Sequence, residues 1–382
     1  MDRQFGFYLH IPFCATRCGY CDFNTYTAED LGGGATRAAY PAQAATEIRL
    51  AARMLTGPAG RPPVRTVFVG GGTPTLLAPA ELGGLLDAIR AEFDLAPDVE
   101  ITTEANPESV DAAALQQLRA VGFNRISFGM QSAREHVLRV LDRTHSPGRA
   151  AQCVAWAQAA GFEHVNLDLI YGTPGESDTD WAQSLHAAVA AGPDHVSAYS
   201  LIVEEGTRLA AQVRRGELPV PDSDVMADRY LMAEDILGAA GFEWYEVSNW
   251  ARGPGAECRH NLLYWTDGDW WGIGPGAHSH RSGTRWWNVK HPREYAERLS
   301  AGASPEADRE DLTEDQQALE RVMLGLRLRA GLPVAALEDA GPALDRAVAD
   351  GLLEPHAIAA GRAILTLRGR LLADAVIRDL TG

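Results

Sequence analysis

Six short apolar runs separated by helical stretches occupy residues 5 to 205, and this alternation limits the possible folds more than any other feature. The runs that predict strands are FGFYLH (5–10), RTVFVG (65–70), VEITTE (99–104), NRISFG (124–129), HVNLDLIYG (164–172) and HVSAYSL (195–201). Helical periodicity lies between them, for example over 80–93, 114–122 and 146–161. Strands and helices that alternate at this spacing predict right-handed βαβ units and a parallel sheet. The pattern fits an open, partly closed barrel as well as a doubly wound sheet.

Polar or glycine-rich clusters follow five of these runs, at the point where each predicted strand ends. They are the cysteine loop after the first run, GGGTPT (70–75), EANPES (104–109), MQS (130–132), and Asp168 with YGTPGE (171–176). A single cluster of this kind is typical of an ordinary turn. Barrel proteins, however, build their sites from the loops that follow the strands, because these loops converge over one face. Their joint placement therefore indicates a site at that edge of the sheet.

The cysteine loop, HIPFCATRCGYCDF (10–23), carries Cys14, Cys18 and Cys21 with the spacing C-x3-C-x2-C. Structural zinc sites normally gather four ligands, often as two separated pairs. A cubane iron–sulfur cluster instead takes one thiolate per iron, and a short loop can supply three of them. The fourth iron then stays available to a small molecule. The spacing therefore favours a 4Fe-4S cluster with an exchangeable ligand over zinc.

Composition narrows the class of protein further. The chain has 382 residues and a net charge of −17, which disfavours a nucleic-acid partner. The five cysteines are an odd number, which indicates reduced thiols in a cytoplasmic protein. The segment MDRQFGFYLH lacks the features of a signal peptide, and no apolar stretch approaches the roughly 20 residues that span a bilayer. We therefore expect a cytoplasmic protein, with peripheral membrane contact only through a partner.

Two further regions are expected after a first unit that covers residues 1–205. Residues 206–310 are rich in aromatic side chains, since seven of the nine tryptophans fall between 244 and 287, and we expect an α+β region there. Residues 311–382 read as the helix TEDQQALERVMLGLRL, two short helices over PVAALEDA and PALDRAVADG, a hairpin over LLEPHAIAAGRAILTL and a last helix. This order is typical of a winged-helix unit. Eight arginines against eleven acidic residues from Asp311 onward argue against DNA binding.

Several motifs together resemble the radical S-adenosylmethionine superfamily, and within it the anaerobic coproporphyrinogen III dehydrogenase group. They are the cysteine loop, GGGTPT, TTEANPE, SFGMQS, LDLIYGTPG and LTLRGRLLAD, which run from residue 5 to about 375. The resemblance implies a partial (β/α)6 barrel and S-adenosylmethionine that chelates the open iron through its amine and carboxylate. It implies that Cys14, Cys18 and Cys21 bind the cluster. The implied S-adenosylmethionine contacts are Tyr8, Tyr20, Gly71, Gly72, Thr73, Glu104, Gln131, Arg143 and Asp168.

Within this group the chain resembles the HemW-type haem-chaperone branch. The true dehydrogenases carry a fourth cysteine where this chain has Phe23, and a long N-terminal arm where 13 residues precede Cys14. The branch is also marked by an H-N-x-x-Y-W motif, present here as HNLLYW (260–265). The resemblance implies a protein that binds haem and passes it to an acceptor protein. The alternative function is oxidative decarboxylation of coproporphyrinogen III, and the complete set of cofactor motifs favours it. The sequence assigns no catalytic residue for that reaction.

The aromatic region offers candidate haem ligands. Haem is a flat apolar disc that needs aromatic walls, an axial imidazole or thiolate, and a few donors at its edge. Together with the resemblance, these needs make His260 the first candidate ligand and Cys258 the second. His278 and His280 are weaker candidates. Cys153 lies in an apolar helical pattern and is predicted to be a core residue.

Overall fold

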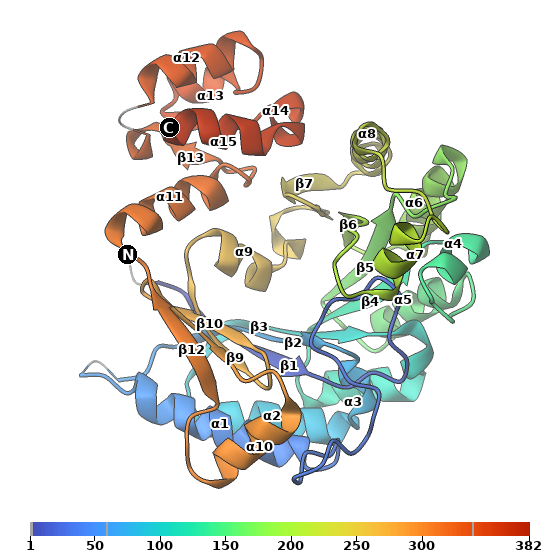
Figure 1. Cartoon of the computed structure of the whole chain (residues 1–382), viewed down its shortest axis with the longest axis vertical. Coiled ribbons are helices and arrows are strands. Elements are labelled where there is room, and N and C mark those ends of the chain that lie inside the picture. The colour runs from blue at the N-terminus through green and yellow to red at the C-terminus, as the bar shows by residue number, and fades with distance from the viewer. Residues whose placement is uncertain (1–2, 59, 338–339) are drawn as a thin grey trace.

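The computed structural model describes residues 3–58, 60–337 and 340–382, and its main feature is a curved sheet of twelve strands (Figure 1). Six parallel strands form the centre in chain order: β1 (Phe5–Ile11), β2 (Val64–Gly71), β3 (Leu95–Ala105), β4 (Arg125–Gln131), β5 (His164–Tyr171) and β6 (His195–Ser200). All six predicted strands are confirmed. The strand order does not reverse, as it would in a doubly wound sheet. The centre of the sheet is therefore an open barrel.

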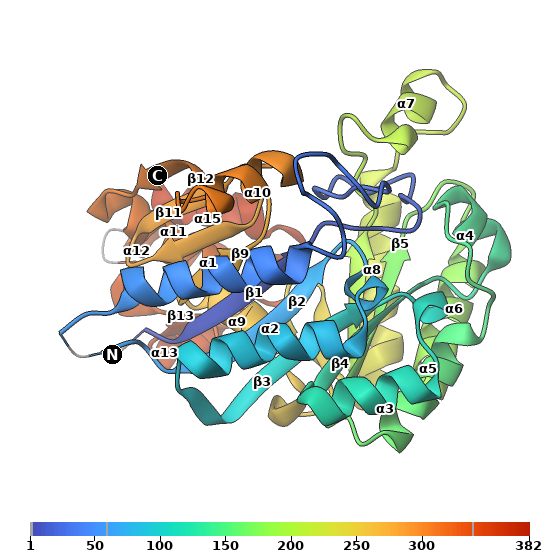
Figure 2. The same cartoon turned by 90° about the horizontal axis from the view of Figure 1, so that it is seen from below.

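Helices between the strands cover the outer face of this barrel, as Figure 2 shows for α1, α2 and α3. These helices are α1 (Tyr40–Leu55), α2 (Pro79–Glu92), α3 (Ala112–Val121), α4 (Glu135–Val140), α5 (Arg149–Ala159) and α6 (Asp178–Ala191). Two of these helices start with the expected side-chain caps: Asp111 accepts the backbone N–H of Ala114 before α3, and Ser177 forms a capping box with Asp180 before α6. Cys153 on α5 is fully buried in the core between helices and sheet, as predicted.

Residues 206–311 do not form a separate sheet but extend the barrel sheet at both edges. The added elements are α7 (Arg208–Arg214), α8 (Ser223–Ala239), β7 (Glu243–Glu246), β8 (Asn249–Ala251), α9 (Arg259–Trp265), β9 (Asp269–Ile273), β10 (His278–Arg281), β11 (Thr284–Asn288), α10 (Pro292–Ser300) and β12 (Glu306–Asp311). β8 and β7 continue the sheet beyond β6, whereas β9 to β12 continue it beyond β1. Four tryptophans of this region, Trp244, Trp250, Trp271 and Trp286, are buried in the same core as the barrel. α9 lies inside the curve of the sheet (Figure 1).

The C-terminal unit has a small core of its own, which includes Leu326, Leu353 and Val376. It consists of α11 (Glu314–Gly325), β13 (Leu332–Pro333), α12 (Gly341–Ala349), α13 (Pro355–Ala359), β14 (Arg362–Ala363), α14 (Leu367–Leu371) and α15 (Ala373–Thr381). The predicted helix over PVAALEDA is reduced to a single turn, Val334–Ala336, and residues 338–339 of it lie outside the described residues.

The predicted hairpin over LLEPHAIAAGRAILTL is wrong. Its middle forms α13, because Pro355 occupies the first turn of a helix, where its fixed φ and missing N–H are favourable. β14 pairs with β13 rather than with the preceding arm. Only an isolated bridge between Leu353 and Leu365 joins the two arms of the expected hairpin. The unit is therefore mostly helical, with one two-stranded ribbon.

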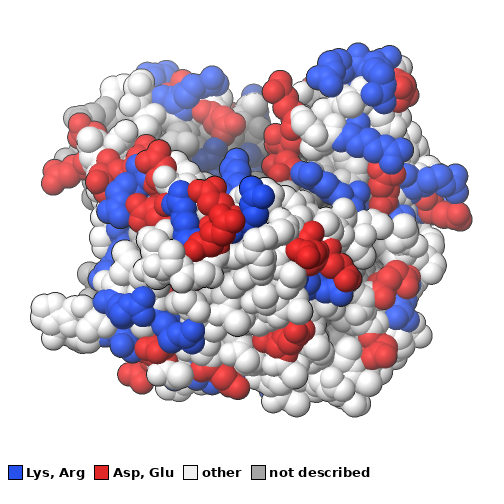
Figure 3. Space-filling model, turned by 60° about the horizontal axis from the view of Figure 1, so that its bottom comes forward, with Lys and Arg blue, Asp and Glu red and all other residues white. Residues whose placement is uncertain are grey.

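Charged side chains of both signs alternate over the surface drawn in Figure 3, and no large area there is of one sign. Many of the arginines are paired, for example Arg298 with Glu294 on α10 and Arg139 with Glu135 on α4. Such exposed pairs add little stability, but they neutralise the cations that a nucleic acid would need. Within the described ranges, no helix combines the length and the apolarity that crossing a membrane requires.

A buried carboxylate joins α1 to the added edge of the sheet. Glu47 is only 1% exposed and accepts hydrogen bonds from the Gly274 N–H (2.8 Å), the Asn288 side chain (2.7 Å) and the Tyr295 hydroxyl (2.6 Å). These three partners follow β9, end β11 and lie on α10. Burial raises the pKa of Glu47 to about 7. Glu47 thus connects the barrel to the region that carries the aromatic side chains.

We expect Glu47→Gln to change how stability depends on pH. The pKa of Glu47 rises from 4.5 to about 7 on folding, so the folded chain holds this proton more tightly than the unfolded chain does. Its contribution to stability is therefore present below pH 4.5 and is lost as the pH rises to 7, by up to roughly 3 kcal/mol. The wild type should lose stability relative to the variant between pH 5 and pH 8 in urea unfolding. If the difference in unfolding free energy between wild type and variant does not vary with pH, the pKa of Glu47 is not raised by folding.

Candidate functional site

The ladder between β1 and β2 continues past the strands and brings the GGGTPT loop against the cysteine loop. The Gly72 N–H donates to the Ile11 carbonyl (2.8 Å), and the Thr73 N–H donates to the Phe13 carbonyl (2.8 Å). A Cβ atom on Gly72 would lie 2.5 Å from the Phe13 oxygen and 2.9 Å from Cys14 Sγ. Only glycine allows this approach. The first cysteine is thereby fixed relative to β2.

The three predicted cluster ligands line one cavity of about 400 Å³ at the carboxyl ends of the strands. Cys14, Cys18 and Cys21 are free thiols. Among the described residues, no three His, Cys, Asp or Glu side chains converge on the position of a single metal ion. The thiols surround a space instead, which suits a cluster whose irons each take one thiolate. Burial raises the pKa of Cys14 and of Cys21, so these thiols remain protonated until a metal displaces the proton.

A polar network behind the cysteines connects them to β3 and β4. Arg143 donates to Cys18 Sγ (3.5 Å) and to the Asn106 side-chain oxygen (2.8 Å). The Asn106 amide donates to the Thr73 hydroxyl (2.9 Å), which in turn points at Cys14 Sγ (3.9 Å). Asn106 was not singled out from the sequence, although it lies in the EANPES cluster. Its amide links the two ends of this network, so Arg143 neutralises thiolate charge from a fixed position.

Two partly buried carboxylates face the same cavity. Glu104 accepts the Gly71 N–H (3.1 Å), and burial together with the charge of Asp168 raises the pKa of Glu104 to about 8. Asp168 accepts the Ser127 hydroxyl (2.6 Å) and the Asn166 amide (2.8 Å). Two acids in one dry cavity favour a ligand that brings hydrogen-bond donors or a positive charge. An ammonium group or ribose hydroxyls meet that need.

The remaining predicted contacts divide into two groups. Tyr20 and Gln131 line the cysteine cavity together with Gly71, Gly72, Glu104, Arg143 and Asp168. Gln131 has a φ of 60°, a left-handed conformation that a non-glycine residue adopts at some cost and often at a functional site. Thr73 is not among the residues that line the cavity; its hydroxyl points at Cys14, which does line it. Tyr8 lines an adjoining, deeper cavity of about 230 Å³, which shares Glu104 and Asp168 with the cysteine cavity, and its hydroxyl lies 3.0 Å from His10 Nδ1.

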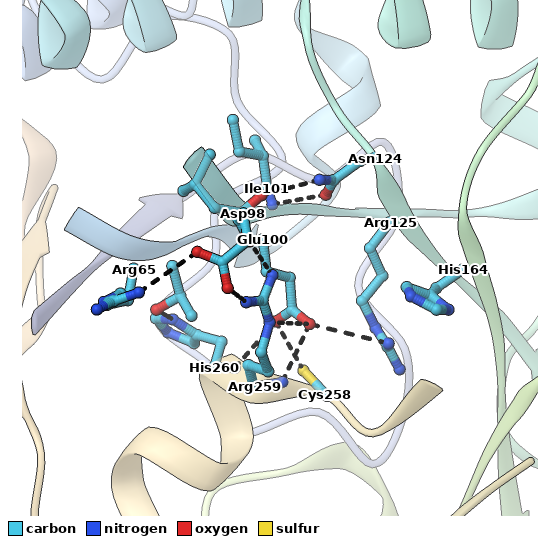
Figure 4. A network of polar contacts seen from close by, with 12 residues as sticks. Arg65, Asp98, Glu100, Ile101, Asn124, Arg125, His164, Cys258, Arg259 and His260 are labelled. Carbon is cyan, nitrogen blue, oxygen red and sulfur yellow. Dashed lines mark hydrogen bonds and ion pairs between the residues drawn. The ribbon is translucent and has the colours of Figure 1, made fainter. Parts of the chain in front are cut away.

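The two candidate haem ligands lie at the start of α9, where a carboxylate from β3 caps the helix (Figure 4). Glu100 accepts the backbone N–H groups of His260 (2.9 Å) and Arg259 (3.0 Å). The Cys258 thiol also points at Glu100 (3.6 Å), and Arg125 lies 3.9 Å from the same carboxylate. Burial raises the pKa of Cys258, as it does for Cys14 and Cys21. The assignment of Cys258 as a haem ligand stays a prediction.

Both ring nitrogens of His260 already have partners. Nδ1 lies 2.8 Å from the Thr66 hydroxyl, and Nε2 lies 2.7 Å from the Tyr264 hydroxyl. The ring stacks on Phe68 with centroids 5.2 Å apart, and burial lowers the pKa of His260 to about 3. No nitrogen of this ring is open to iron in this arrangement. The sequence could not show this, because Thr66 and Phe68 come from a distant strand, and His260 instead positions Tyr264.

Residues 8–188 match the Radical SAM superfamily, and residues 312–372 match the HemN C-terminal domain. The structure is similar to that of coproporphyrinogen III oxidase (HemN) from Escherichia coli, with a TM-score of 0.83 and 24% identity, over 99% of this chain and 90% of that one. At this identity the likeness shows the fold alone. The fold and the cysteine-lined cavity together define a radical S-adenosylmethionine protein, a class whose members hold a 4Fe-4S cluster and S-adenosylmethionine.

The chain is also similar along its whole length to curated relatives. It is 58% identical to heme chaperone HemW of Mycobacterium tuberculosis, over 100% of this chain and 95% of the relative. It is 35% identical to heme chaperone HemW of Escherichia coli, over 91% and 90% of the two chains. The Bacillus subtilis protein of the same name is 33% identical over 98% of both. The chain belongs to the HemW family.

We expect Gly72→Ala to abolish cluster assembly without unfolding the protein. The added methyl group would collide with the Phe13 carbonyl and with Cys14, which must move away from the cavity. After anaerobic reconstitution, the variant should therefore lose most of its iron and sulfide per chain. Gly84→Ala is the matched control, because a Cβ atom there meets no other atom within 4 Å and α2 should gain about 1 kcal/mol. Full iron content in Gly72→Ala would contradict this role of the close approach.

Proposed function

We propose that this protein binds haem and delivers it to an acceptor protein, and that it carries a 4Fe-4S cluster with exchangeable S-adenosylmethionine. The observation that carries the proposal is the 58% identity to heme chaperone HemW of Mycobacterium tuberculosis over the whole chain. The cysteine cavity supports the cofactor part of the proposal. Its three thiols lie in the loop after β1, and its two carboxylates lie near the carboxyl ends of β3 and β5 in the same barrel.

The cavity residues have distinct proposed roles. Cys14, Cys18 and Cys21 bind three irons, while Glu104 and Asp168 accept hydrogen bonds from the ammonium and ribose groups of S-adenosylmethionine. When bound, the cluster and S-adenosylmethionine supply one-electron chemistry. Arg143 and Gln131 complete the wall; the guanidinium group balances thiolate charge and can pair with the ligand carboxylate.

The position of Phe23 supports haem binding rather than catalysis at the cluster. Its side chain is 55% exposed, and it lines the cysteine cavity, the deeper cavity and a neighbouring open groove. A phenyl ring cannot bind iron, but it offers an apolar surface to a flat ligand. Coproporphyrinogen oxidation is the second candidate, because most of the residues predicted to hold the cofactors line one cavity.

Haem titration of the anaerobically reconstituted protein separates these two functions. We expect about one haem per chain, because each chain has one aromatic region. We expect no protoporphyrinogen when coproporphyrinogen III, S-adenosylmethionine and reductant are supplied. The titration is repeated with and without S-adenosylmethionine, and HemN from Escherichia coli serves as the positive control for decarboxylation. Protoporphyrinogen formation at a rate near that of the control, without haem binding, would replace the chaperone proposal with the enzymatic one.

A further inference from the structure

An open groove of about 320 Å³ lies beside the cysteine loop, on the added edge of the sheet. Phe23 from the cysteine loop, Tyr264 from the end of α9, Trp270 from β9 and His278 from β10 are among its lining residues. The His278 side chain is exposed to solvent. Within the described residues, its ring nitrogens make no hydrogen bond, unlike those of His260 and His280. The groove therefore presents an available imidazole between aromatic walls.

Aromatic contacts hold these walls in place. The Trp270 indole N–H donates to the His278 carbonyl (3.0 Å), and the Trp270 ring packs edge-on against Tyr264 with centroids 4.7 Å apart. The His278 ring stacks on Trp287 of the neighbouring strand, with centroids 5.7 Å apart and planes 26° apart. Tyr264 is itself held by His260. The HNLLYW motif thus contributes a wall of the groove rather than an iron ligand.

The segment after the cysteines is tied to the hairpin that carries His278. The Asn24 amide donates to the carbonyls of Pro275 (2.9 Å) and Lys290 (2.7 Å). The Tyr26 hydroxyl donates to the same Lys290 carbonyl (3.2 Å). These bonds fix the cysteine loop against both ends of the hairpin. Phe23 and His278, although 255 positions apart in the sequence, therefore face one groove.

The charge beside the groove is also distinctive, because Lys290 is the only lysine of the chain. Its side chain is exposed, and its carbonyl accepts the amide of Asn24, which lines the groove. Partial burial, and after it the Lys290 charge, lower the pKa of His278. A neutral imidazole is the form of histidine that binds iron. An ammonium group at the edge of an aromatic groove suits an apolar ligand that carries a carboxylate.

We propose that haem binds in this groove with His278 as its axial ligand and Lys290 as a partner for a propionate. This inference rests on the proposed function and specifies its site. The aromatic walls match the porphyrin faces, the imidazole matches the Lewis-acidic iron, and the ammonium group matches the carboxylates at the rim. The groove is open on one side, so an acceptor protein can reach the bound haem without unfolding of the barrel.

Haem titration of variants tests the ligand directly. His278→Ala should weaken haem binding by more than about tenfold, since even indirect changes around a metal site cost that much, and should alter the Soret band. His278→Met should keep binding but change the spectrum to that of a thioether-ligated haem. His260→Ala should weaken binding and leave the axial-ligand spectrum unchanged. His186→Ala is the matched control, because His186 is an exposed histidine on α6, outside the groove.

The outcomes separate this site from the proposed function. If the wild type binds no haem, the proposed function fails and the site fails with it. If the wild type binds haem and His278→Ala binds it as tightly with the same spectrum, only the site is wrong. A changed axial-ligand spectrum in His260→Ala, with His278→Ala unchanged, would return the ligand to His260. Circular dichroism and iron content verify that each variant is folded.

The role of Lys290 is tested with a modified ligand. Lys290→Gln should weaken the binding of haem by about threefold to tenfold, in line with a partly exposed ion pair, and the loss should shrink at high salt. Haem dimethyl ester lacks the propionate charges, so the wild type and Lys290→Gln should bind it equally. Equal affinity of the two proteins for unmodified haem would show that Lys290 does not contact a propionate.

Discussion

The cysteine cavity depends on the close approach of two backbone segments beyond the ends of β1 and β2. Hydrogen bonds from Gly72 and Thr73 extend the parallel ladder into both loops, and the absence of a side chain at Gly72 lets Cys14 sit against it. Because Cys14 is fixed there, Thr73 and Asn106 can connect it to Arg143. Local backbone geometry thus decides where the thiols face.

The interior of the barrel is closed by α9, and the polar groups there are structural. Glu100 satisfies the N–H groups at the start of this helix, and Arg125 lies near the same carboxylate and donates to the Ala256 carbonyl (2.9 Å). Burying these charges is costly unless they have partners, and several polar residues meet at this helix end, although Arg125 Nη2 has no partner among the described residues. His260 lies among these residues, and its hydrogen bond to the Tyr264 hydroxyl holds Tyr264 in place at the groove.

Much of the fold and the cavity could be predicted from sequence because both follow from short-range patterns. Apolar runs give the strands, and polar clusters after parallel strands must meet at one edge. The partners of His260 could not be foreseen, because Thr66 is 194 positions away and only the folded sheet brings it close. Asn106 was visible in a turn cluster, yet turn residues of this type usually serve only the turn. A hairpin was predicted where α13 forms, because alternating apolar residues outweighed the helix-starting Pro355.

Phe23 is the residue at which the cysteine cavity and the groove meet. An exposed phenyl ring in the cysteine loop makes no favourable contact with solvent, so its contribution must come from a group that packs against it. Asn24 and Tyr26 bind the hairpin immediately after it, so any ligand that orders the cysteine loop also orders one wall of the groove. Thermodynamic linkage then requires that groove occupancy stabilise the loop in return. Occupancy of the cysteine cavity and occupancy of the groove would in this way be coupled through the five backbone residues 22–26, with no change of fold.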